Sequence, residues 1–436
     1  MMSQNRSCFP AGRHCAEDAG TRNGKYMEVV QLSSIQPGRR LARAVFNAEG
    51  QLLYPPGEAI TQRHILTLEQ CGIGSVAVES LPDKATDGVP SRPEDILETI
   101  RTAIGDRFRL HDMEDERSKA IFNLAVERQG RIVLSQGGKV SLGSKPTPAF
   151  QTQRPPKVDM QRLLDASHRM GTLPMVFHRL VEMINNPGVT ATELAKVIAM
   201  DPALSARLLR LVNSPFYGMA FKVDTISRAV VMVGTRQLVM LAMGATLVTA
   251  FRGVPVSLVN MRSFWAHSIS CGAAARVLAR HAGLPEAESF FVAGLLHDIA
   301  RLLIYTQLPN HSLYMLTEAK RRSASLHELE LEALGFTHEE LSGLLLRSWN
   351  CPGDLVQRVE RHHNPLTEQS TREDVILPAA NMLSQALGYG TSGEICIPPL
   401  NAFAWDILGV SAEQLMEVCV QLDESVRELR SFFSGA

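Results

Sequence analysis

The sequence predicts a mostly α-helical protein with a small α+β module near its N-terminus. Helix-start signals recur through the second half of the chain, where a hydroxyl or carboxylate side chain precedes a helical apolar pattern. The first part shows short apolar runs between turn residues, a pattern typical of strands. With 436 residues, 45% of them hydrophobic, the chain is long enough for two or three folded domains.

The first 26 residues are polar and lack the apolar core of a signal peptide. We therefore expect residues 1–26 to form a disordered tail of a protein that is not exported. Because a strand-like run follows Met27, translation starts at either Met1 or Met27.

Residues 27–82 show the pattern of the α+β module. Thr61 is placed to cap a helix that ends at Gly72, and a strand follows this helix. Two earlier strands flank the turn sequence Asn-Ala-Glu-Gly, which predicts a hairpin. The expected strands are residues 41–45, 51–54 and 75–78.

A helical connector and a linker come next. Residues 93–129 are charged and carry an apolar residue at every fourth position, so we expect a connecting helix or coiled segment. The apolar positions are Ile96, Ile100, Ile104 and Phe108. Residues 130–157 are rich in Gly, Ser, Gln and Pro, which predicts a linker and a domain boundary.

Residues 158–390 predict one helical domain, and residues 391–436 a helical C-terminal extension. Capping boxes, in which a hydroxyl and an acid or amide satisfy free helix N–H groups, begin at Thr190, Ser325, Thr337 and Ser411. Asp201 adds another helix start because Pro202 follows it at the first helical position.

Apolar segments in this half of the chain predict core. The longest apolar run, residues 238–251, is too short to span a membrane, and we expect a buried helix. The methionine-rich run at 230–243 is expected to be core rather than a binding groove. The last helix, residues 411–430, is expected to pack on the bundle rather than to dimerise.

The charge balance argues against binding to nucleic acid or to anionic lipid. The chain has 44 basic and 45 acidic residues, a formal charge of -1, and therefore exerts no general attraction on polyanions. Its seven cysteines are scattered without a C-x-x-C pair, which indicates reduced thiols and a cytoplasmic protein.

Several ordered motifs carry a resemblance to a known family. They are LPMVFHRLVEMINNPGVTATELAKVIAMDPALSARLLRLVNSPFYG, FVAGLLHDIARLLI, THEELSGLLLRSWNCP and VERHHNP. Together they resemble the HDOD domain, a relative of the HD and HD-GYP phosphohydrolases. The resemblance implies an HDOD-type all-helical bundle across residues 158–390. Residues 27–82 are similar to a module often found ahead of such domains.

The same resemblance implies a set of candidate metal ligands. HD-type phosphohydrolases order a first histidine, an adjacent His-Asp pair and a later aspartate around a divalent metal. The matching positions, with the further histidines of HD-GYP enzymes, are His267, His297, Asp298, His338, His362, His363 and Asn381. Iron, manganese or zinc would suit imidazole and carboxylate ligands.

Three departures favour a regulatory domain over an enzyme. Asn381 stands where the family has an aspartate, and an amide neutralises a metal less than a carboxylate does. The pair His297-Asp298 continues as Ile-Ala-Arg instead of the Gly-Lys type. No Gly-Tyr-Pro follows His363. HDOD domains are regarded as non-hydrolytic relatives, so the resemblance implies a signalling module that requires no cofactor.

Alternatives remain open for the site and for the function. The favoured interpretation of His297 and Asp298 is a buried structural pair. A metal site without turnover is the second interpretation, and a phosphohydrolase site is the third. The leading function is a non-enzymatic regulator that binds a protein partner in signalling or a nucleotide. The alternatives are a metal-dependent phosphodiesterase acting on a cyclic dinucleotide or nucleotide, and a nucleotide sensor. His281, His311 and His327 are expected to be incidental.

Overall fold

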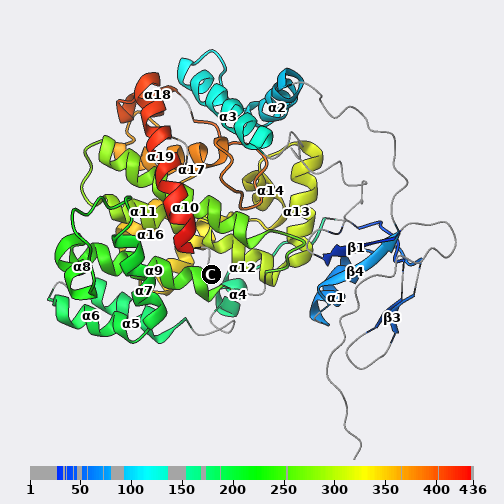
Figure 1. Ribbon diagram of the computed structural model, residues 1–436, viewed down its shortest axis with the longest axis horizontal. Helices are drawn as coiled ribbons and strands as arrows, with labels where there is room; N and C mark the ends of the chain where they lie inside the picture. Colours follow the sequence, from blue (N-terminus) through cyan, green and yellow to red (C-terminus); the bar gives the residue numbers. More distant parts are fainter. Residues whose placement is uncertain are drawn as a thin grey trace, which may run out of the picture. The chain divides into compact units, whose positions relative to one another are not determined.

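The computed structural model describes residues 27–32, 35, 37–42, 44–46, 52–55, 57–71, 73–79, 93–135, 154–167, 173–186, 188–251, 254–364, 366–400 and 402–433. The chain divides into two units, Met1–Asp87 and Gly88–Ala436. Figure 1 shows the elements of both. The predicted tail at 1–26, the hairpin turn at 47–50 and most of the predicted linker lie outside the described residues.

The first unit is the predicted α+β module. Its elements are β1 (Met27–Gln31), β2 (Val45–Phe46), β3 (Leu52–Tyr54), α1 (Gln62–Gln70) and β4 (Ser75–Glu79). Strand β1 pairs antiparallel with β4, and β2 with β3. Thr61 caps α1 as predicted, because its side chain accepts the backbone N–H of His64 at 3.2 Å. The strand expected at 41–45 is shorter than predicted, since Leu41 forms only an isolated bridge to Val78.

The expected connector is a pair of helices, α2 (Pro93–Phe108) and α3 (Glu116–Ser135), which pack on each other. The break has a local cause: Asp112 and Asp115 accept the backbone N–H groups of Glu114 and Arg117, each at 2.9 Å. Such local hydrogen bonds compete with helix continuation. Helix α3 also runs past residue 129, where the connector was expected to end.

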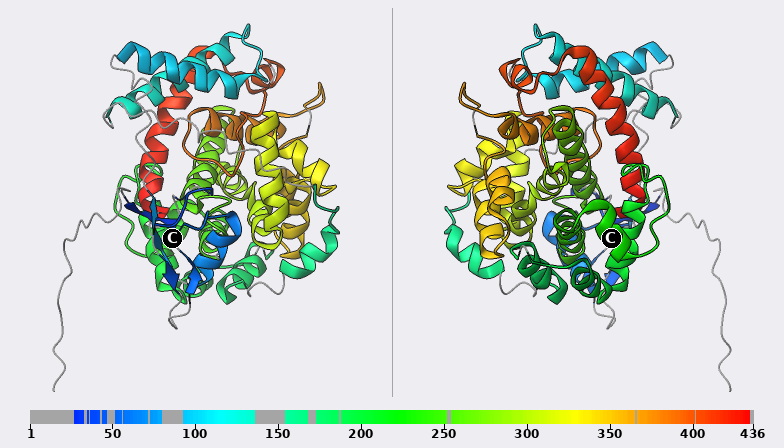
Figure 2. Two further views of the ribbon diagram at one scale, coloured as in Figure 1. Left: turned by 90° about the vertical axis from the view of Figure 1, so that its right-hand side faces the viewer. Right: turned by 90° about the vertical axis from the view of Figure 1, so that its left-hand side faces the viewer.

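The remaining helices build one bundle that contains a large apolar cluster and a second, smaller one. Helix α10 is buried along almost its whole length, and α11, α17 and α19 pack against it (Figures 1 and 2). The helices are α4 (Met160–Ser167), α5 (Met175–Ile184), α6 (Ala191–Ala199), α7 (Pro202–Val212), α8 (Ile226–Val233), α9 (Thr235–Ala250), α10 (Met261–His281), α11 (Ala287–Leu296), α12 (Ile299–Gln307), α13 (Pro309–Arg322), α14 (Leu326–Ala333), α15 (His338–Ser348), α16 (Gly353–Glu360), α17 (Arg372–Ala386), α18 (Ala402–Leu408) and α19 (Ala412–Phe433).

The predicted helix starts are confirmed with one difference in detail. Thr190 and Ser411 form complete capping boxes, and Asp201 accepts the N–H of Leu204 at 2.9 Å. The Thr337 N–H donates to Glu340, as a capping box requires. Ser325 caps α14 as predicted, but its side chain accepts the N–H of His327 instead of that of Glu328.

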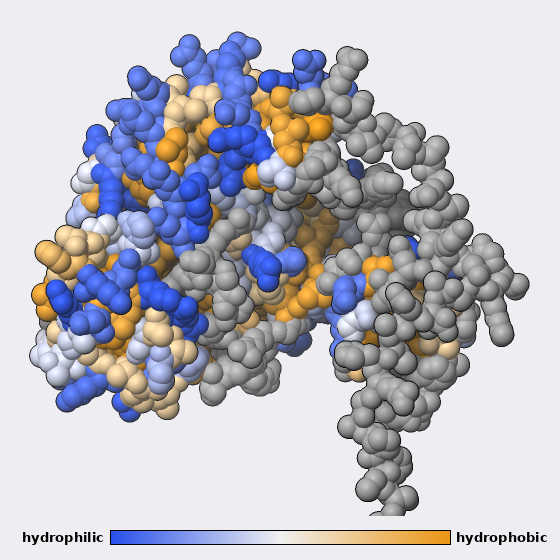
Figure 3. Space-filling model, in the orientation of Figure 1, coloured by the Kyte–Doolittle hydropathy of each residue, from blue (hydrophilic) through white to orange (hydrophobic). Residues whose placement is uncertain are grey.

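The apolar segments are mostly core, as predicted. Residues 238–248 of α9 are buried, including Met240 and Met243, whereas Met232 is 48% exposed. Met232 differs because the methionine run is not one helix: Gly234, at φ 100°, separates α8 from α9. The side chains of Leu415, Val418 and Leu422 on α19 are buried, so this helix packs on the bundle. Hydrophilic residues cover much of the face seen in Figure 3.

Among the described helices, none is by itself both long and apolar enough to cross a membrane. Helices α8 and α9 satisfy the length and composition criteria only when they are taken together, and the chain bends by 119° between them.

Candidate functional site

Four of the predicted residues converge on Asp298 inside the bundle. The two oxygens of its carboxylate face histidines of three different segments. Oδ2 lies 3.1 Å from His297 Nε2 and 3.5 Å from His267 Nε2, and Oδ1 lies 3.0 Å from His338 Nε2. His362 joins the group because its Nε2 lies 3.2 Å from His338 Nε2. All five side chains are buried, with at most 2% of their surface exposed.

Close packing of α10 on α11 brings the first two histidines together. Gly272 and Gly294 meet where these helices cross, and a Cβ on Gly294 would lie 2.6 Å from the backbone of Gly272. Only glycine allows so close an approach. His267 on α10 therefore lies beside His297, at the end of α11, and Asp298 begins α12 directly afterwards.

Each imidazole is held through its Nδ1 atom. His297 Nδ1 donates to the carbonyl of Gly294 and His362 Nδ1 to that of Val359, both at 2.7 Å. A carbonyl only accepts, so the proton of a neutral ring lies on Nδ1 and the lone pair on Nε2. Glu330 Oε2 plays the same role for His338 at 2.5 Å. His267 Nδ1 lies 3.1 Å from the Ser384 hydroxyl, which donates its proton to the His267 carbonyl and so can accept the Nδ1 proton. Four Nε2 lone pairs therefore point into one small volume.

The carboxylate at the middle of this volume accepts no hydrogen bond of ordinary geometry. Both oxygens of Asp298 are buried and without such a partner among the described residues, although three imidazole nitrogens lie within 3.5 Å. Two pairs of Nε2 atoms also face each other at 3.2 Å, His267 with His297 and His338 with His362. Lone pairs at that distance repel unless a proton or a cation lies between them.

A second layer of charge surrounds the histidines. Arg301 Nε donates to Glu330 at 2.9 Å, and its Nη1 lies 3.5 Å from Asp298 Oδ2. Glu339 accepts from His327 at 2.6 Å. The buried carboxylates of Asp298, Glu330 and Glu339, together with the more distant Glu394, thus outnumber the one guanidinium buried among them, that of Arg301. The surplus of negative charge can be balanced by imidazolium protons or by a divalent cation.

The pKa shifts of the metal-free site follow this surplus. Burial alone would lower the pKa of His297 and His338, but Asp298 and Glu330 outweigh burial, so the pKa of His297 is raised and that of His338 rises to about 9. His267 lacks such compensation, and burial lowers its pKa to about 4. Burial also lowers the pKa of His362.

His363 and Asn381 lie on the outer side of the centre. The His363 ring packs on the His362 ring with centroids 4.3 Å apart and is half-buried. Asn381 is buried on α17, where its Oδ1 accepts from Gln385 at 3.0 Å. These residues line a cavity of about 520 Å³ together with His327 and His362. The structure therefore places His363 and Asn381 next to the centre, and their oxygens and nitrogens have no contact with Asp298 among the described residues.

Part of the site was not predicted from the sequence. His327, which was expected to be incidental, contacts Glu339 and packs on the His363 ring at 4.7 Å between centroids. Glu330, Glu339 and Ser384 were not singled out either, although they orient the predicted histidines. The spacing of Glu330 and His338 across the short turn between α14 and α15 was the available signal.

The residues present suit a divalent cation. Imidazole nitrogens with anchored Nδ1 atoms and one carboxylate are the ligands of many iron, manganese and zinc sites. His267, His297, Asp298, His338 and His362 would hold such an ion. Candidate ligand atoms lie within 4.8 Å of one another in three groups of the described residues: His267 with the His297-Asp298 pair, His338 with His362 and His363, and His338 with Glu330 and Glu339.

Comparison with known proteins places these residues in one domain. Residues 170–365 match the HDOD domain family. An uncharacterized protein of Treponema pallidum (strain Nichols) is 30% identical over 202 residues, which are 45% of this chain and 38% of that protein's length. The structure of a candidate phosphohydrolase from Shewanella amazonensis SB2B is 25% identical, with a TM-score of 0.51 over 62% of this chain and 97% of that chain. An HDOD domain protein with unknown function from Geobacter sulfurreducens is 22% identical, with a TM-score of 0.48 over 63% of this chain and 98% of that chain.

Proposed function

We propose that the domain matched by the HDOD family at residues 170–365 is a regulatory signalling module that holds one divalent cation without hydrolysing a substrate. Iron, manganese and zinc are the candidate metals, because imidazole and carboxylate ligands suit all three. Regulation then depends on what the domain binds, a protein partner or a nucleotide, and not on turnover.

One observation supports a bound cation. The two buried oxygens of Asp298 accept no well-formed hydrogen bond from the described residues, although three Nε2 atoms lie within 3.5 Å of them. If imidazolium protons neutralised the site, the N–H groups of His297 and His338 would be expected to point at these oxygens. A buried carboxylate without such bonds is costly by several kcal/mol, about the scale of an unpaired buried charge. A cation removes both this cost and the repulsion between facing lone pairs.

Two features argue against hydrolysis. The five side chains that would hold the cation are buried, which leaves little room for a substrate phosphate beside it. Asn381 adds no charge, and its amide oxygen already accepts a hydrogen bond from Gln385. A bound divalent cation would supply Lewis acidity and a more acidic bound water. His267, His297, His338 and His362 orient their lone pairs, and Glu330 and Ser384 hold the protons of two of them at Nδ1.

A second candidate function is a metal-dependent phosphodiesterase acting on a cyclic dinucleotide or nucleotide. The cavity of about 520 Å³ favours it, because His362, His363 and Asn381 connect this cavity to the centre. Its volume lies in the range of small-molecule sites.

The test is the metal content of the full chain, purified after growth with iron, manganese and zinc supplied. We expect close to one equivalent of metal in the wild type and almost none in His297→Ala/Asp298→Ala. Asp298→Asn keeps the shape of the side chain and should also lose metal, which separates ligation from misfolding. His178→Gln is the matched control, because His178 is exposed on α5.

The outcomes divide the candidates. Metal in the wild type without cleavage of cyclic dinucleotides or bis(p-nitrophenyl) phosphate supports the regulatory module. Metal with cleavage that Asp298→Asn abolishes supports the phosphodiesterase instead. Metal at the level of Asp298→Asn in every sample contradicts both, and the histidines are then structural residues neutralised by protons.

A further inference from the structure

The cavity of about 520 Å³ beside the histidine centre, which we call the centre cavity, has no lysine or arginine among the described residues that line it. Two carboxylates line it, those of Glu328 and Glu394. Glu328 is exposed on α14. Glu394 is 6% exposed, and its oxygens accept backbone N–H groups, among them that of Leu326 at the start of α14 at 2.9 Å. Apart from its histidines, the wall therefore carries negative charge only.

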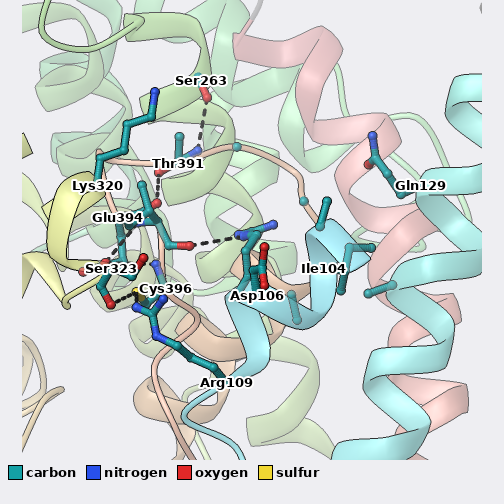
Figure 4. A pocket seen from close by; sticks show the side chains of 17 residues that line it. Ile104, Asp106, Arg109, Gln129, Ser263, Lys320, Ser323, Thr391, Glu394 and Cys396 are labelled. Atoms are coloured by element: carbon teal, nitrogen blue, oxygen red, sulfur yellow. Dashed lines mark hydrogen bonds between the residues drawn. The ribbon is translucent and has the colours of Figure 1, made fainter. Parts of the chain in front are cut away.

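A neighbouring cavity of about 600 Å³ has the opposite lining. It shares Glu394 and Cys396 with the centre cavity but is also lined by Arg107, Arg109 and Lys320, and we call it the cation-lined cavity. Figure 4 shows Arg109 beside Cys396 in this cavity, where Arg109 Nη2 donates to Cys396 Sγ at 2.6 Å. These basic side chains line the cation-lined cavity and not the centre cavity, so a ligand in the centre cavity does not meet them.

A divalent cation at the histidine centre would not reverse the charge of the centre cavity. The buried carboxylates of Asp298, Glu330 and Glu339 all lie within 3.5 Å of a ring nitrogen of His338. They outnumber the guanidinium of Arg301 that is buried among them, so their surplus of negative charge offsets a bound cation. An anionic ligand would therefore lose its hydration in the centre cavity without meeting a basic side chain.

Neutral polar groups supply the hydrogen-bonding part of the wall. Asn381 is 2% exposed, and the one hydrogen bond of its side chain among the described residues is made by Oδ1, which accepts from Gln385 at 3.0 Å. The amide N–H groups of Asn381 are therefore left for a ligand in the cavity. Asn364 and Ser325 add a second amide and a hydroxyl group to the wall.

The rest of the wall is apolar or formed by flat rings. Its apolar side chains include Leu110 and Leu400, with Pro378 and the pair Pro398-Pro399. The imidazole rings of His362 and His363 line it as well, with centroids 4.3 Å apart. Heteroaromatic rings stack on imidazole and pack on apolar side chains, so such a wall suits the faces of a flat ring.

We propose that the centre cavity binds a small, flat heteroaromatic molecule without negative charge, such as a nucleoside or a ring amide. The amide groups of the wall match the donors and acceptors at the edge of such a ring, and the carboxylates disfavour a phosphate. The volume lies in the range of small-molecule sites. This inference rests on the proposed function, in which the domain acts through what it binds, and it restricts the small-molecule ligand to one without a phosphate.

The experiment is isothermal titration of the full chain at about pH 8, where accessible imidazole groups are uncharged. Two pairs of probes are compared, adenosine with AMP and nicotinamide with nicotinic acid, because the second member of each pair carries negative charge that the first lacks. We expect at least one uncharged probe to bind, and its anionic partner to bind at least about tenfold more weakly, since the desolvated anion meets no basic side chain.

Binding of neither uncharged probe, or binding of the anionic partner that is as tight or tighter, overturns the proposal. The metal content of the same samples tests the proposed function separately. Metal without binding of an uncharged probe contradicts only this inference, whereas binding of an uncharged probe without metal contradicts only the bound cation.

Leu110→Trp should block the cavity. Leu110 is 45% exposed, so a larger side chain there need not disturb the core, and the best uncharged probe should bind about tenfold or more weakly. Leu134→Trp is the matched control, because Leu134 is 41% exposed on α3 and does not line the cavity. Equal losses in these two variants would overturn the proposal.

Glu328→Lys tests the charge of the wall, because it places an ammonium group at the cavity. The anionic partner should gain at least about fivefold in affinity relative to the uncharged probe. Glu182→Lys makes the same change at an exposed position of α5 that does not line the cavity, and it should leave this ratio unchanged. The same change of ratio in both variants, or no change in either, would contradict the proposed selection by charge.

Discussion

The histidine centre and the cation-lined cavity lie in the same helical unit but use charge in opposite ways. At the centre, Arg301 is 2% exposed and contacts Asp298 and Glu330, so its charge is neutralised by buried carboxylates of the fold itself. In the cavity, Arg109 is exposed and donates to the Cys396 thiol, which is a neutral group and not a carboxylate. The difference teaches that burial with a counterion makes a charge structural, whereas an exposed charge at a cavity contributes little to folding.

One segment belongs to both regions. Residues 388–396 line the cavity, and within them Ser392 and Glu394 approach Arg301, with Ser392 Oγ accepting from Arg301 Nη1 at 2.8 Å. Glu394 Oε2 lies 3.9 Å from Arg301 Nη2. The two regions are therefore joined by a short polar chain of contacts, and substitutions along it show how far each region is independent.

The largest effect is expected at Arg301. Arg301→Met keeps much of the side-chain volume but leaves Asp298 and Glu330 without their buried guanidinium, and we expect a loss of about 3–5 kcal/mol in the free energy of unfolding. Arg109→Gln removes the same charge from an exposed position and should change it by less than about 0.5 kcal/mol. Denaturant unfolding followed by tryptophan fluorescence measures both.

Fluorescence suits this comparison because the three tryptophans, Trp265, Trp349 and Trp405, all lie in the helical unit. Similar losses for the two variants would contradict the distinction between a buried structural charge and an exposed one. A small loss at Arg301 alone would mean that the site relaxes around the unpaired carboxylates or takes up protons in place of the guanidinium.

The helical bundle was largely predictable from the sequence, because its signals are local. A hydroxyl at Thr190 and a carboxylate at Glu193 are enough to start a helix, and both were found in the expected roles. The break between α2 and α3 was missed, since the apolar spacing alone favours continuation. It depends on two aspartates that bond to the backbone, which is a competition that periodicity does not record.

The candidate site was predictable only where a motif marked it. The resemblance supplied the histidines and Asp298, which lie in four separate segments. Glu330, Glu339 and His327 were missed because the motifs mark only the candidate ligands, although the short spacing of Glu330 and His338 across the turn between α14 and α15 was a local signal of their proximity. The cation-lined cavity was wholly missed, because its cations come from residues 107, 109 and 320, which only the tertiary fold brings together.

An intermediate effect is expected at Gly390, which lies between the two regions. A Cβ there would collide with the Ser263 carbonyl and lie 2.7 Å from the His267 N–H nitrogen. Gly390→Ala should push residues 388–396 away from α10, and overpacking of this kind costs about 1–3 kcal/mol. Because Glu394 and Cys396 of this segment also line the centre cavity, metal content and binding of the best uncharged probe should both fall.

Gly105→Ala is the matched control, because a Cβ on this helical glycine meets no atom within 4 Å. It should leave stability unchanged or raise it by up to about 1 kcal/mol through better helix propensity. If Gly390→Ala impaired only one of the two binding activities, the metal site and the centre cavity would be more independent than their proximity indicates.

The smallest effect is expected in the pH dependence of stability at Glu394. Burial raises the pKa of this carboxyl above its usual 4.5 in the folded chain. A raised folded pKa means that folding takes up a proton, so this contribution is complete below pH 4.5 and is lost as the pH rises through the folded pKa. Glu394→Gln cannot titrate, and the free energy of unfolding of the wild type relative to this variant should fall as the pH rises above 4.5.

Glu318 offers a control of opposite sign. Arg321 and then Arg322 bind its carboxylate and, against burial, lower its pKa to about 2. Its stabilising contribution is therefore present above pH 4.5 and lost as the pH falls toward 2, so the wild type relative to Glu318→Gln should gain stability as the pH rises through that window. Glu394→Gln also turns an amide N–H toward backbone donors, which adds a loss independent of pH. The test is therefore how the difference in the free energy of unfolding between the wild type and each variant changes with pH, and not its size at one pH. If this difference changed with pH in the same direction for both variants, Glu394 would remain ionised beside Arg301 and belong to the charge network of the centre.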